Sequence, residues 1–333
     1  MVKLQFDWES AGNRFEALVN RFVKWAFSFR GGITLVCLGG LLCLPLTGRE
    51  YLVTIVITAM ILAIFAASWD LLAGFAGQTS FGHAAFFGIS GYFTAALVKF
   101  YGVHWFVAIF IGAGCAVIFS LLIGIPCLRL KGPYLALGTL AFALILYNLF
   151  LTGDWLGGTE GISALPNIGD VFVVFYIVAA FMVASLIIMR AIVDSNLGTI
   201  LKAIRDDEVG ADATGINTTV YKLIAFMVSG LFAGIAGALF VLDTTAVNPA
   251  LFQPLYSFYA IVMASIGGIA TIYGSIVGAF LFRLTGELLR PLAAASLLIF
   301  ATILILIIRF AEEGVMNPVL GHVQDLWDKI RGR

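Results

Sequence analysis

Residues 51–73 read YLVTIVITAMILAIFAASWDLLA, and this stretch decides the fold class because only one charged residue, Asp70, interrupts it. An apolar run of about 20 residues is long enough to cross a bilayer as a helix. Similar runs recur along the chain, which is 61% hydrophobic and 11% charged, with a mean hydropathy of +1.05. A soluble protein carries roughly 25% charged residues. The sequence therefore predicts an all-α, polytopic membrane protein.

We expect about ten membrane-spanning helices within one membrane domain at 31–310. Their approximate limits are 31–47, 51–73, 78–99, 104–127, 133–152, 170–190, 218–242, 255–270, 272–290 and 291–310. Charged residues run through residues 1–30, so this segment is not predicted to be a cleavable signal. It forms either a helix on the cytoplasmic membrane surface or a polar leader, and 311–333 forms a cytoplasmic tail.

The loop charges predict the orientation of the chain. The leader, the loop near residue 130, the loop 190–217 and the tail all carry Lys or Arg, whereas 153–169 and 243–254 carry acids and no Lys or Arg. Cytoplasmic loops of membrane proteins are enriched in Lys and Arg. Ten spans with both termini in the cytoplasm place every basic loop inside and both acidic loops outside.

A glycine-rich break in the apolar pattern supplies the first candidates for lining a solute path. Residues 73–83 read AGFAGQTSFGH. Non-helical backbone at membrane depth is tolerated only where protein or a water-filled cavity covers it, and broken helices can present N–H groups to a solute. The candidates are Gln78, Thr79, Ser80 and His83. The alternative is a surface loop in which His83 has an ordinary hydrogen-bond partner.

Three further path candidates lie outside this segment. An acid within a span is costly and usually faces the bundle interior or a cavity, so Asp70 could bind a solute amine or support a structural hydrogen-bond network. Residues 151–162, LTGDWLGGTEGI, lie in a predicted outer loop. There Thr159 and Glu160 could order around an incoming solute, or the segment could seat a partner protein or form a plain turn.

Two other patterns are interpreted as packing features. Small residues at helical spacing allow close helix approach, and the chain has such a set at Gly230, Gly234, Gly237, Gly274 and Gly278. Arg283, Glu287 and Arg290 also lie at helical spacing, which makes two ion pairs available. We interpret these charges as neutralising one another near the end of a span.

The loop 195–217 is predicted to form two short helices joined by a charged bend. Ile200, Ala203 and Ile204 share one helical face, and the acids at 206–208 favour the start of a second helix. Gly215 fits a helix stop. We interpret the loop as a cytoplasmic docking element, with candidate residues Lys202, Arg205, Asp206, Asp207, Glu208 and Gly215.

The sequence lacks a pattern for catalysis or nucleotide binding. The dipeptide Gly-Lys never occurs, so a Walker phosphate loop is absent. The three histidines form no metal-ligand pattern, and the four cysteines lie in apolar runs, where free thiols are expected. A net charge of zero gives no electrostatic case for nucleic acid. The chain is not expected to be an enzyme or to bind a cofactor or metal, and any ATP must be hydrolysed by another chain.

Several ordered segments resemble the LivM-type permeases of branched-chain amino acid ABC importers. The matching segments are GFAGQTSFGHAAFFGI at 74–89, LRLKGPYLALGTL at 128–140, LTG at 151–153 with GGTEGI at 157–162, AIRDDE at 203–208 running to TGIN at 214–217, KLIAF at 222–226 and AGIAGA at 233–238. The resemblance runs from about residue 55 to residue 290 and does not cover the leader or the tail.

The resemblance implies an importer permease with a helix arrangement like that of type II importers, in the bacterial inner membrane. It implies a second related permease in a heterodimer, two ABC ATPase subunits that bind ATP and Mg, and a periplasmic solute-binding protein. Residues 199–215 would be the coupling helices that contact an ATPase, and transport would follow alternating access. Family members also carry urea, short amides, other amino acids and aromatic or sulfonate-like acids. This chain departs from the family at Asp70, where an uncharged residue is usual, and the departure favours a functional role for that acid.

Other function classes remain as alternatives. An ATP-independent channel or facilitator for a solute such as urea or an amide predicts transport without ATP and a tolerant loop 195–217. A membrane enzyme is disfavoured because the sequence lacks a reactive cluster. An ATP-driven sugar importer is disfavoured by the matches at 128–140 and 151–162.

Overall fold

The computed structural model describes residues 39–130, 132–153, 157–290 and 302 of the chain. The chain divides into two compact units, Met1–Arg49 with Val319–Arg333, and Glu50–Pro318. In the first unit the described residues are helical and end in the 3₁₀ helix η1 (Leu44–Thr47).

Several predictions fall where the structure gives no description. The surface helix or leader at 1–30, the tail at 311–333 and most of the first span lie outside the described residues. The tenth span, 291–310, also lies outside them except for residue 302. Cys37 also lies outside the described residues. The other three cysteines are free, as expected, but the expected burial holds only for Cys127, since Cys115 is half-buried and Cys43 is exposed.

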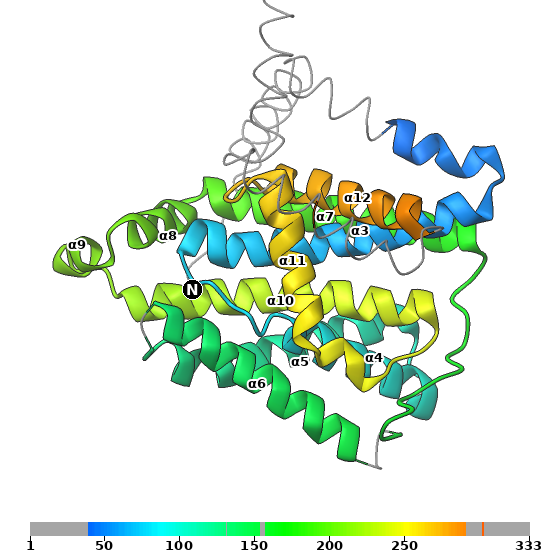
Figure 1. Ribbon diagram of the computed structural model, residues 1–333, viewed down its shortest axis with the longest axis horizontal. Coiled ribbons are helices and arrows are strands. Elements are labelled where there is room, and N and C mark those ends of the chain that lie inside the picture. The colour runs from blue at the N-terminus through cyan, green and yellow to red at the C-terminus, as the bar shows by residue number, and fades with distance from the viewer. Residues whose placement is uncertain (1–38, 131, 154–156, 291–301, 303–333) are drawn as a thin grey trace, which may run out of the picture. The chain divides into compact units, whose positions relative to one another are not determined.

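The second unit is a bundle of long helices (Figure 1). Its elements are α3 (Glu50–Asp70), the π-helix η2 (Leu71–Phe75), α4 (Ala84–Tyr101), α5 (Trp105–Cys127), α6 (Pro133–Thr152), α7 (Val171–Asp194), α8 (Asn196–Asp206), α9 (Glu208–Ala213), α10 (Thr218–Thr244), the 3₁₀ helix η4 (Pro249–Phe252), α11 (Pro254–Gly267) and α12 (Ile272–Leu289). The described residues contain no strand, and a single isolated β-bridge joins two loops.

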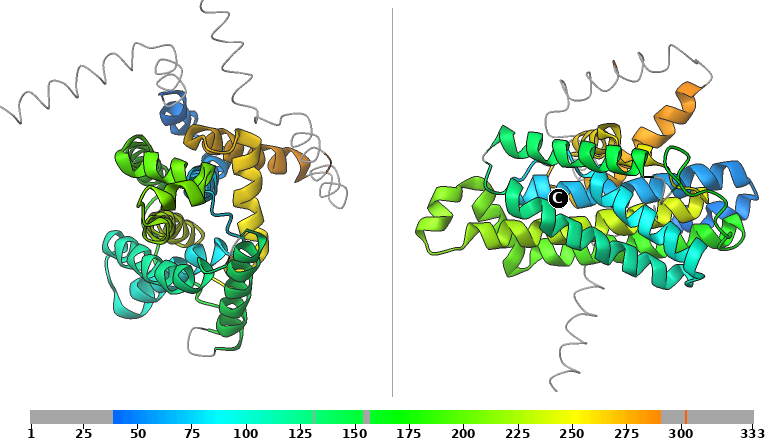
Figure 2. Two further views of the ribbon diagram at one scale, coloured as in Figure 1. Left: turned by 90° about the vertical axis from the view of Figure 1, so that its left-hand side faces the viewer. Right: turned by 90° about the horizontal axis from the view of Figure 1, so that it is seen from below.

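The all-α membrane architecture is confirmed, although the count of ten spans was approximate. Seven helices in the described part are long and apolar enough to cross a membrane. The predicted span 255–270 corresponds to α11, which has 14 residues and lies across the direction of α3 and α10 (Figures 1 and 2). At about 1.5 Å per residue, such a helix is shorter than the roughly 30 Å hydrocarbon layer.

The predicted span 78–99 also differs, because its helix begins only at Ala84. Gly77 has a positive φ of 69°, which ends the preceding helix, and residues 77–82 are non-helical. The polar and glycine-rich composition of this segment explains why the helix starts late.

Helices α3 and α10 form the centre of the bundle. They pack against each other and run in opposite directions (Figure 1). In the best spanning windows, 83% of the residues of the α3 helix and 72% of those of α10 are buried. The corresponding shares are 39% or less for α5, α6, α7 and α12. A helix that is apolar all round belongs inside a bundle, which accounts for the position of α3.

The two halves of the bundle share one packing pattern that is not obvious in the sequence. In the first half α4 packs on α5, and both pack on α10; in the second half α11 packs on α12, and both pack on α3. Each central helix therefore supports the two helices that follow the other central helix. Helix α3 is therefore in direct contact with α11 and α12 as well as with α7 and α10.

The glycines predicted to allow close packing do so. A Cβ at Gly237 would collide with the backbone of Phe87 on α4, and one at Gly278 would collide with the carbonyl of Met263 on α11. Gly234 lies against the backbone of Ala113 on α5. Small residues at these crossings bring the helix backbones into contact, as expected where lipid supplies no hydrophobic drive.

Candidate solute path and coupling site

The segment between α3 and α4 folds back along the end of α3. The indole Nε1 of Trp69 donates to the carbonyl of Ser80 at 2.8 Å, and the Ser68 hydroxyl pairs with His83 Nε2 at 2.9 Å. The backbone N–H of Gln78 donates to Leu72 O at 3.1 Å. The break in the apolar pattern is thus a non-helical segment in which several backbone and side-chain polar groups have protein partners, as expected at membrane depth.

Three helices that are distant in sequence hold this segment and the helix residues on either side of it, Ser68 on α3 and Ala84 on α4, in place. The Thr139 hydroxyl on α6 accepts from Phe81 N at 3.1 Å, and the Ser257 hydroxyl on α11 accepts from Ala84 N at 2.9 Å. On α10, the Ser229 hydroxyl donates to Ser68 O at 2.8 Å. These side chains replace the backbone bonds that a continuous helix would have made.

Two of the path candidates in this segment, Ser80 and His83, are fully buried within the subunit. The His83 ring lies 5.2 Å from the ring of Phe65 and 5.5 Å from that of Phe86. His83 Nδ1 has no hydrogen-bond partner among the described residues. His83 thus has a hydrogen-bond partner in Ser68, as the alternative expected, but its ring is buried in the core of the subunit and not in a surface loop.

Asp70 is also fully buried, and its carboxylate contacts the turn between α11 and α12. Its Oδ1 accepts a hydrogen bond from Ala270 N at 2.7 Å. Ala270 has a positive φ of 63°, a conformation that non-glycine residues seldom adopt. Asp70 therefore stabilises a strained turn 200 residues away in sequence.

The other path candidates are accessible but do not gather around Asp70. Gln78 is half-buried and Thr79 is exposed, and the Gln78 side-chain amide donates to Ala76 O at 3.1 Å. Thr159 and Glu160 are exposed in the loop between α6 and α7. The seven candidates thus occupy three separate places rather than one site.

The loop between α6 and α7 pairs with the loop after α10. Ile162 and Val247 form an antiparallel bridge with two N–H···O bonds of 2.8 Å, and Leu165 N donates to Thr245 O at 3.1 Å. Lys99 Nζ on α4 donates to Ser163 O at 2.6 Å. The two acidic loops therefore lie on one side of the bundle, at the end opposite to α8 and α9 (Figure 1).

The two short helices predicted in loop 195–217 are present as α8 and α9. The Asp207 carboxylate accepts from Gly210 N at 3.0 Å and so caps the start of α9, and Glu208 occupies its first turn. Gly215 follows the end of α9 with a positive φ of 87°, which fits the predicted helix stop. Local capping signals in the sequence therefore determine both helix ends.

The apolar face predicted for α8 coincides only in part with the face that is buried in the structure. The buried residues are Gly198, Leu201 and Ile204, whereas Ala203 is exposed. A Cβ at Gly198 would collide with the carbonyl of Val193 at the end of α7. This close approach sets the rotation of α8, and it could not be deduced from hydrophobic spacing alone.

Basic residues tie α8 and α9 to the bundle. Arg205 Nη1 donates to Gly74 O in the π-helix η2 at 2.8 Å, and Lys202 Nζ lies 5.6 Å from the centre of the Phe75 ring. Arg205 also pairs with Asp206 on its own helix at 2.8 Å. These contacts attach the docking element to the end of α3.

A further ion pair fixes α9 to α10. Lys222 Nζ lies 2.5 Å from Glu208 Oε2, and the Lys222 side chain is 8% exposed while that of Glu208 is 47% exposed. Taking the lysine ammonium out of water is costly, so Glu208 is the partner that makes its burial tolerable. The acids of the predicted bend therefore have distinct roles as a helix cap and a lysine partner.

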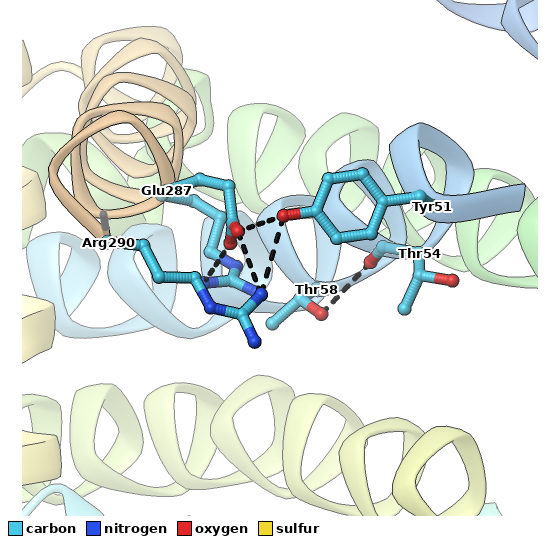
Figure 3. A network of polar contacts seen from close by, with 6 residues as sticks. Tyr51, Thr54, Thr58, Glu287 and Arg290 are labelled. Carbon is cyan, nitrogen blue, oxygen red and sulfur yellow. Dashed lines mark hydrogen bonds and ion pairs between the residues drawn. The ribbon is translucent and has the colours of Figure 1, made fainter. Parts of the chain in front are cut away.

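A separate charged network joins the first part of α3 to the last turns of α12 (Figure 3). Glu287 forms ion pairs with Arg290 at 3.0 Å and with Arg283 at 3.5 Å, and it accepts a hydrogen bond from the Tyr51 hydroxyl. Both predicted pairs are therefore present. The network neutralises one of the two arginine charges and connects two helices far apart in sequence.

The described residues contain no group of three or more His, Cys, Asp or Glu side chains that could hold a metal ion.

The family model for the permease component of the branched-chain amino acid transport system matches residues 51–308. The chain belongs to this family. The described helices and the polar contacts between them are thus those of a multi-pass transport permease, and the permease has the role of a transport subunit rather than of an enzyme.

Two curated relatives of the permease are LivM proteins. The high-affinity branched-chain amino acid transport system permease protein LivM of Escherichia coli is 28% identical over 295 residues, which cover 79% of this chain and 69% of the relative. The protein of the same name from Salmonella typhimurium is 27% identical over the same shares. No solved structure matches the permease. The resemblance to LivM-type permeases is therefore confirmed.

Several residues that hold the permease together were missed by sequence reasoning. They are Trp69, Thr139, Lys222, Ser257 and Ala270, which contact the segment 76–83, Asp70 or Glu208. Lys222 gave a usable signal, since a lysine near the start of a span needs a partner. The hydroxyl residues gave none, because serine and threonine are common in membrane helices.

Proposed function

We propose that this permease imports branched-chain amino acids or similar small polar solutes, driven by ATP hydrolysis on separate subunits. Membership of the permease family supports transport, and the names of the two LivM relatives support the class of cargo. The family resemblance supports a heterodimer with a second related permease, two ABC ATPases and a periplasmic solute-binding protein. ATP and Mg would then be bound by the ATPases alone.

The observation that carries the ATP-driven mechanism is the exposed surface of α9. Val209 is 79% exposed on this short helix, although it is apolar, and Asp212 is exposed beside it. Helix α9 lies at the end of the bundle (Figure 1). The apolar and acidic side chains that this short helix exposes are available for contact with a partner protein. A self-sufficient facilitator needs no such element, so we favour the importer over the channel.

The proposed membrane location is the bacterial inner membrane, with both termini in the cytoplasm. The basic loop 190–217 supports a cytoplasmic position for α8 and α9. The loops 157–165 and 245–253, which are joined by the bridge between Ile162 and Val247, would then face the periplasm, where a binding protein could dock. Lipid would cover the apolar outer faces of helices such as α5 and α7.

Transport would proceed by alternating access. Closure of the ATPases would move residues 199–215, and the free energy for switching would come from the different affinities of the ATPases for the two states. Gln78, Thr79, Thr159 and Glu160 are exposed or half-buried and are the candidates that a solute could reach in this conformation. Asp70, Ser80 and His83 would meet solute only if the packing around them opened.

A cross-linking experiment tests the docking of α9. The full complex with its ATPases is prepared with Val209→Cys in a permease whose native cysteines are replaced by serine. A benzophenone maleimide bonded to the Cys thiol is expected, on illumination, to insert into a C–H bond of an ATPase subunit. Glu160→Cys, exposed in the opposite loop, serves as the matched control and is expected to give no such product. A product from Glu160→Cys but none from Val209→Cys would refute the proposal.

A competition experiment tests the cargo. Labelled leucine is supplied with the binding protein to liposomes that hold the complex and ATP, and uptake is competed by unlabelled isoleucine, urea, glutamate or an aromatic acid. We expect isoleucine to compete best. Strong competition by urea alone would move the cargo to the amide class and reject branched-chain amino acids.

A further inference from the structure

The π-helix η2 at the end of α3 lies between the coupling helices and the turn that joins α11 to α12. A π-helical turn is rare and is often found at functional sites. Here it contains Gly74, whose carbonyl accepts from Arg205 Nη1 at 2.8 Å. The same residue faces the opposite neighbour, because a Cβ at Gly74 would collide with Asp70 Oδ1 and would lie 2.6 Å from Ala270 N.

The contacts on the α8 side are close and involve backbone. Gly77 has a positive φ of 69°, and a Cβ there would lie 3.0 Å from Arg205 Cγ and 3.3 Å from Arg205 Cα. Helix α8 is thus seated directly on the end of η2. A displacement of α8 cannot be absorbed by side-chain rotation alone, because backbone of both segments is involved.

The contacts on the other side are equally direct. Asp70 Oδ1 holds Ala270 N at 2.7 Å, and Ala270 keeps a positive φ of 63°. Beyond the turn, Gly267 on α11 and Gly274 on α12 are in backbone contact. The turn therefore joins two helices that both pack on α3, and the Asp70 carboxylate is the polar link between that turn and α3.

We propose that Arg205 and Asp70 are positioning residues of one mechanical relay, which carries movement of the coupling helices through η2 to the turn between α11 and α12. The relay rests on the proposed function, since it assumes that ATPases move α8. In this relay Arg205 acts through its hydrogen bond to Gly74, within the permease, and not through a contact with the ATPase. The relay gives Asp70 a role as a backbone acceptor instead of a ligand for a solute amine.

The test measures solute taken up per ATP hydrolysed, using the full complex with its partner subunits in liposomes. Arg205→Ala and Asp70→Ala are each expected to lower this ratio about tenfold, in the range typical of allosteric coupling, while the ATPases still co-purify and hydrolyse ATP. The double variant is expected to lose no more than either single variant, because both residues belong to one relay.

Two further variants distinguish the relay from a solute-binding role of Asp70 and from a general effect of removing an arginine. Asp70→Asn keeps an oxygen that can accept from Ala270 N and is expected to retain the wild-type ratio, whereas a ligand for a solute amine would lose its charge and raise KM. Arg129→Ala removes an exposed arginine in the turn after α5, away from η2, α11 and α12, and it is expected to change nothing.

The outcomes distinguish failure of the relay from failure of the proposed function. Uptake by the wild-type complex without ATP would refute the importer itself. If uptake by the wild type requires ATP but Arg205→Ala and Asp70→Ala leave the solute taken up per ATP unchanged, the relay alone would be overturned. Loss of the ATPases from the Arg205→Ala complex would also overturn it, because Arg205 would then be a docking residue.

Discussion

Alanine at Gly237 is expected to destabilise the bundle, whereas alanine at Gly114 is expected to stabilise it. Both glycines lie inside long helices, α10 and α5, where alanine is favoured over glycine by about 0.8–1 kcal/mol. A Cβ at Gly237 would collide with the backbone carbonyl of Phe87, but nothing lies within 4 Å of a Cβ at Gly114. The two substitutions therefore share the propensity gain and differ in packing.

The expected loss of stability in Gly237→Ala follows from which atoms collide. The atoms at Gly237 belong to the backbones of two helices, so α4 must move away from α10 as a body. Overpacking of this kind costs about 1–3 kcal/mol, which leaves a net loss of up to about 2 kcal/mol after the helix preference is subtracted. Gly114→Ala is expected to gain up to about 1 kcal/mol.

Thermal unfolding of the detergent-solubilised permease measures both effects in parallel. We expect the midpoint of Gly237→Ala to fall below that of the wild type and the midpoint of Gly114→Ala to lie at or above it. A Gly237→Ala variant as stable as Gly114→Ala would refute the reasoning, because the α4–α10 crossing would then have room for a methyl group.

The remaining predictions concern polar contacts between side chains or between a side chain and the backbone. Trp69→Phe removes the donor to Ser80 O and is expected to lower the free energy of unfolding by about 1–3 kcal/mol, measured by the same thermal assay; an unchanged midpoint would contradict it. Lys222→Met is expected to leave stability nearly unchanged but to make α9 more accessible to protease. Glu208→Gln leaves a buried lysine unpaired and is expected to destabilise the permease more than Lys222→Met does. A larger loss of stability in Lys222→Met than in Glu208→Gln would show that the lysine does not depend on its partner. Glu287→Gln is expected to lower the thermal midpoint more than Arg290→Gln, because Glu287 contacts both arginines and Tyr51. Equal shifts of the midpoint would contradict the inference that Glu287 is the central residue of this network.

Much of the fold could be predicted because lipid makes the apolar pattern nearly sufficient. Helix α6 begins at Pro133 and ends at Thr152, as predicted, since a proline at the first helical position and a following glycine mark both ends. The late start of α4 and the short α11 were harder to predict. The start of α4 depends on a partner, Ser257, that lies 173 residues from Ala84. Helix α11 ends at Gly267, and the next residue, Gly268, has a positive φ of 111°.

Less of the candidate site than of the fold could be predicted, because a polar residue within a span is usually buried against protein whether or not it has a function. Asp70 and His83, which the sequence suggested for the solute path, are both fully buried, and their role on that path stays a prediction. Their partners, Ala270 and Ser68, give each a structural contact that the sequence did not predict. The caps of α9 depend on neighbouring residues and were predictable, whereas the rotation of α8 depends on Gly198 meeting another helix and was not.

The most direct test of the ATP-driven importer is uptake of labelled leucine by the full complex in liposomes, with its binding protein outside, compared with and without ATP inside. We expect uptake to require ATP and to stop when the ATPase subunits carry a substitution that abolishes hydrolysis. Equal uptake in all three conditions would contradict the importer and leave a facilitator as the function of this permease.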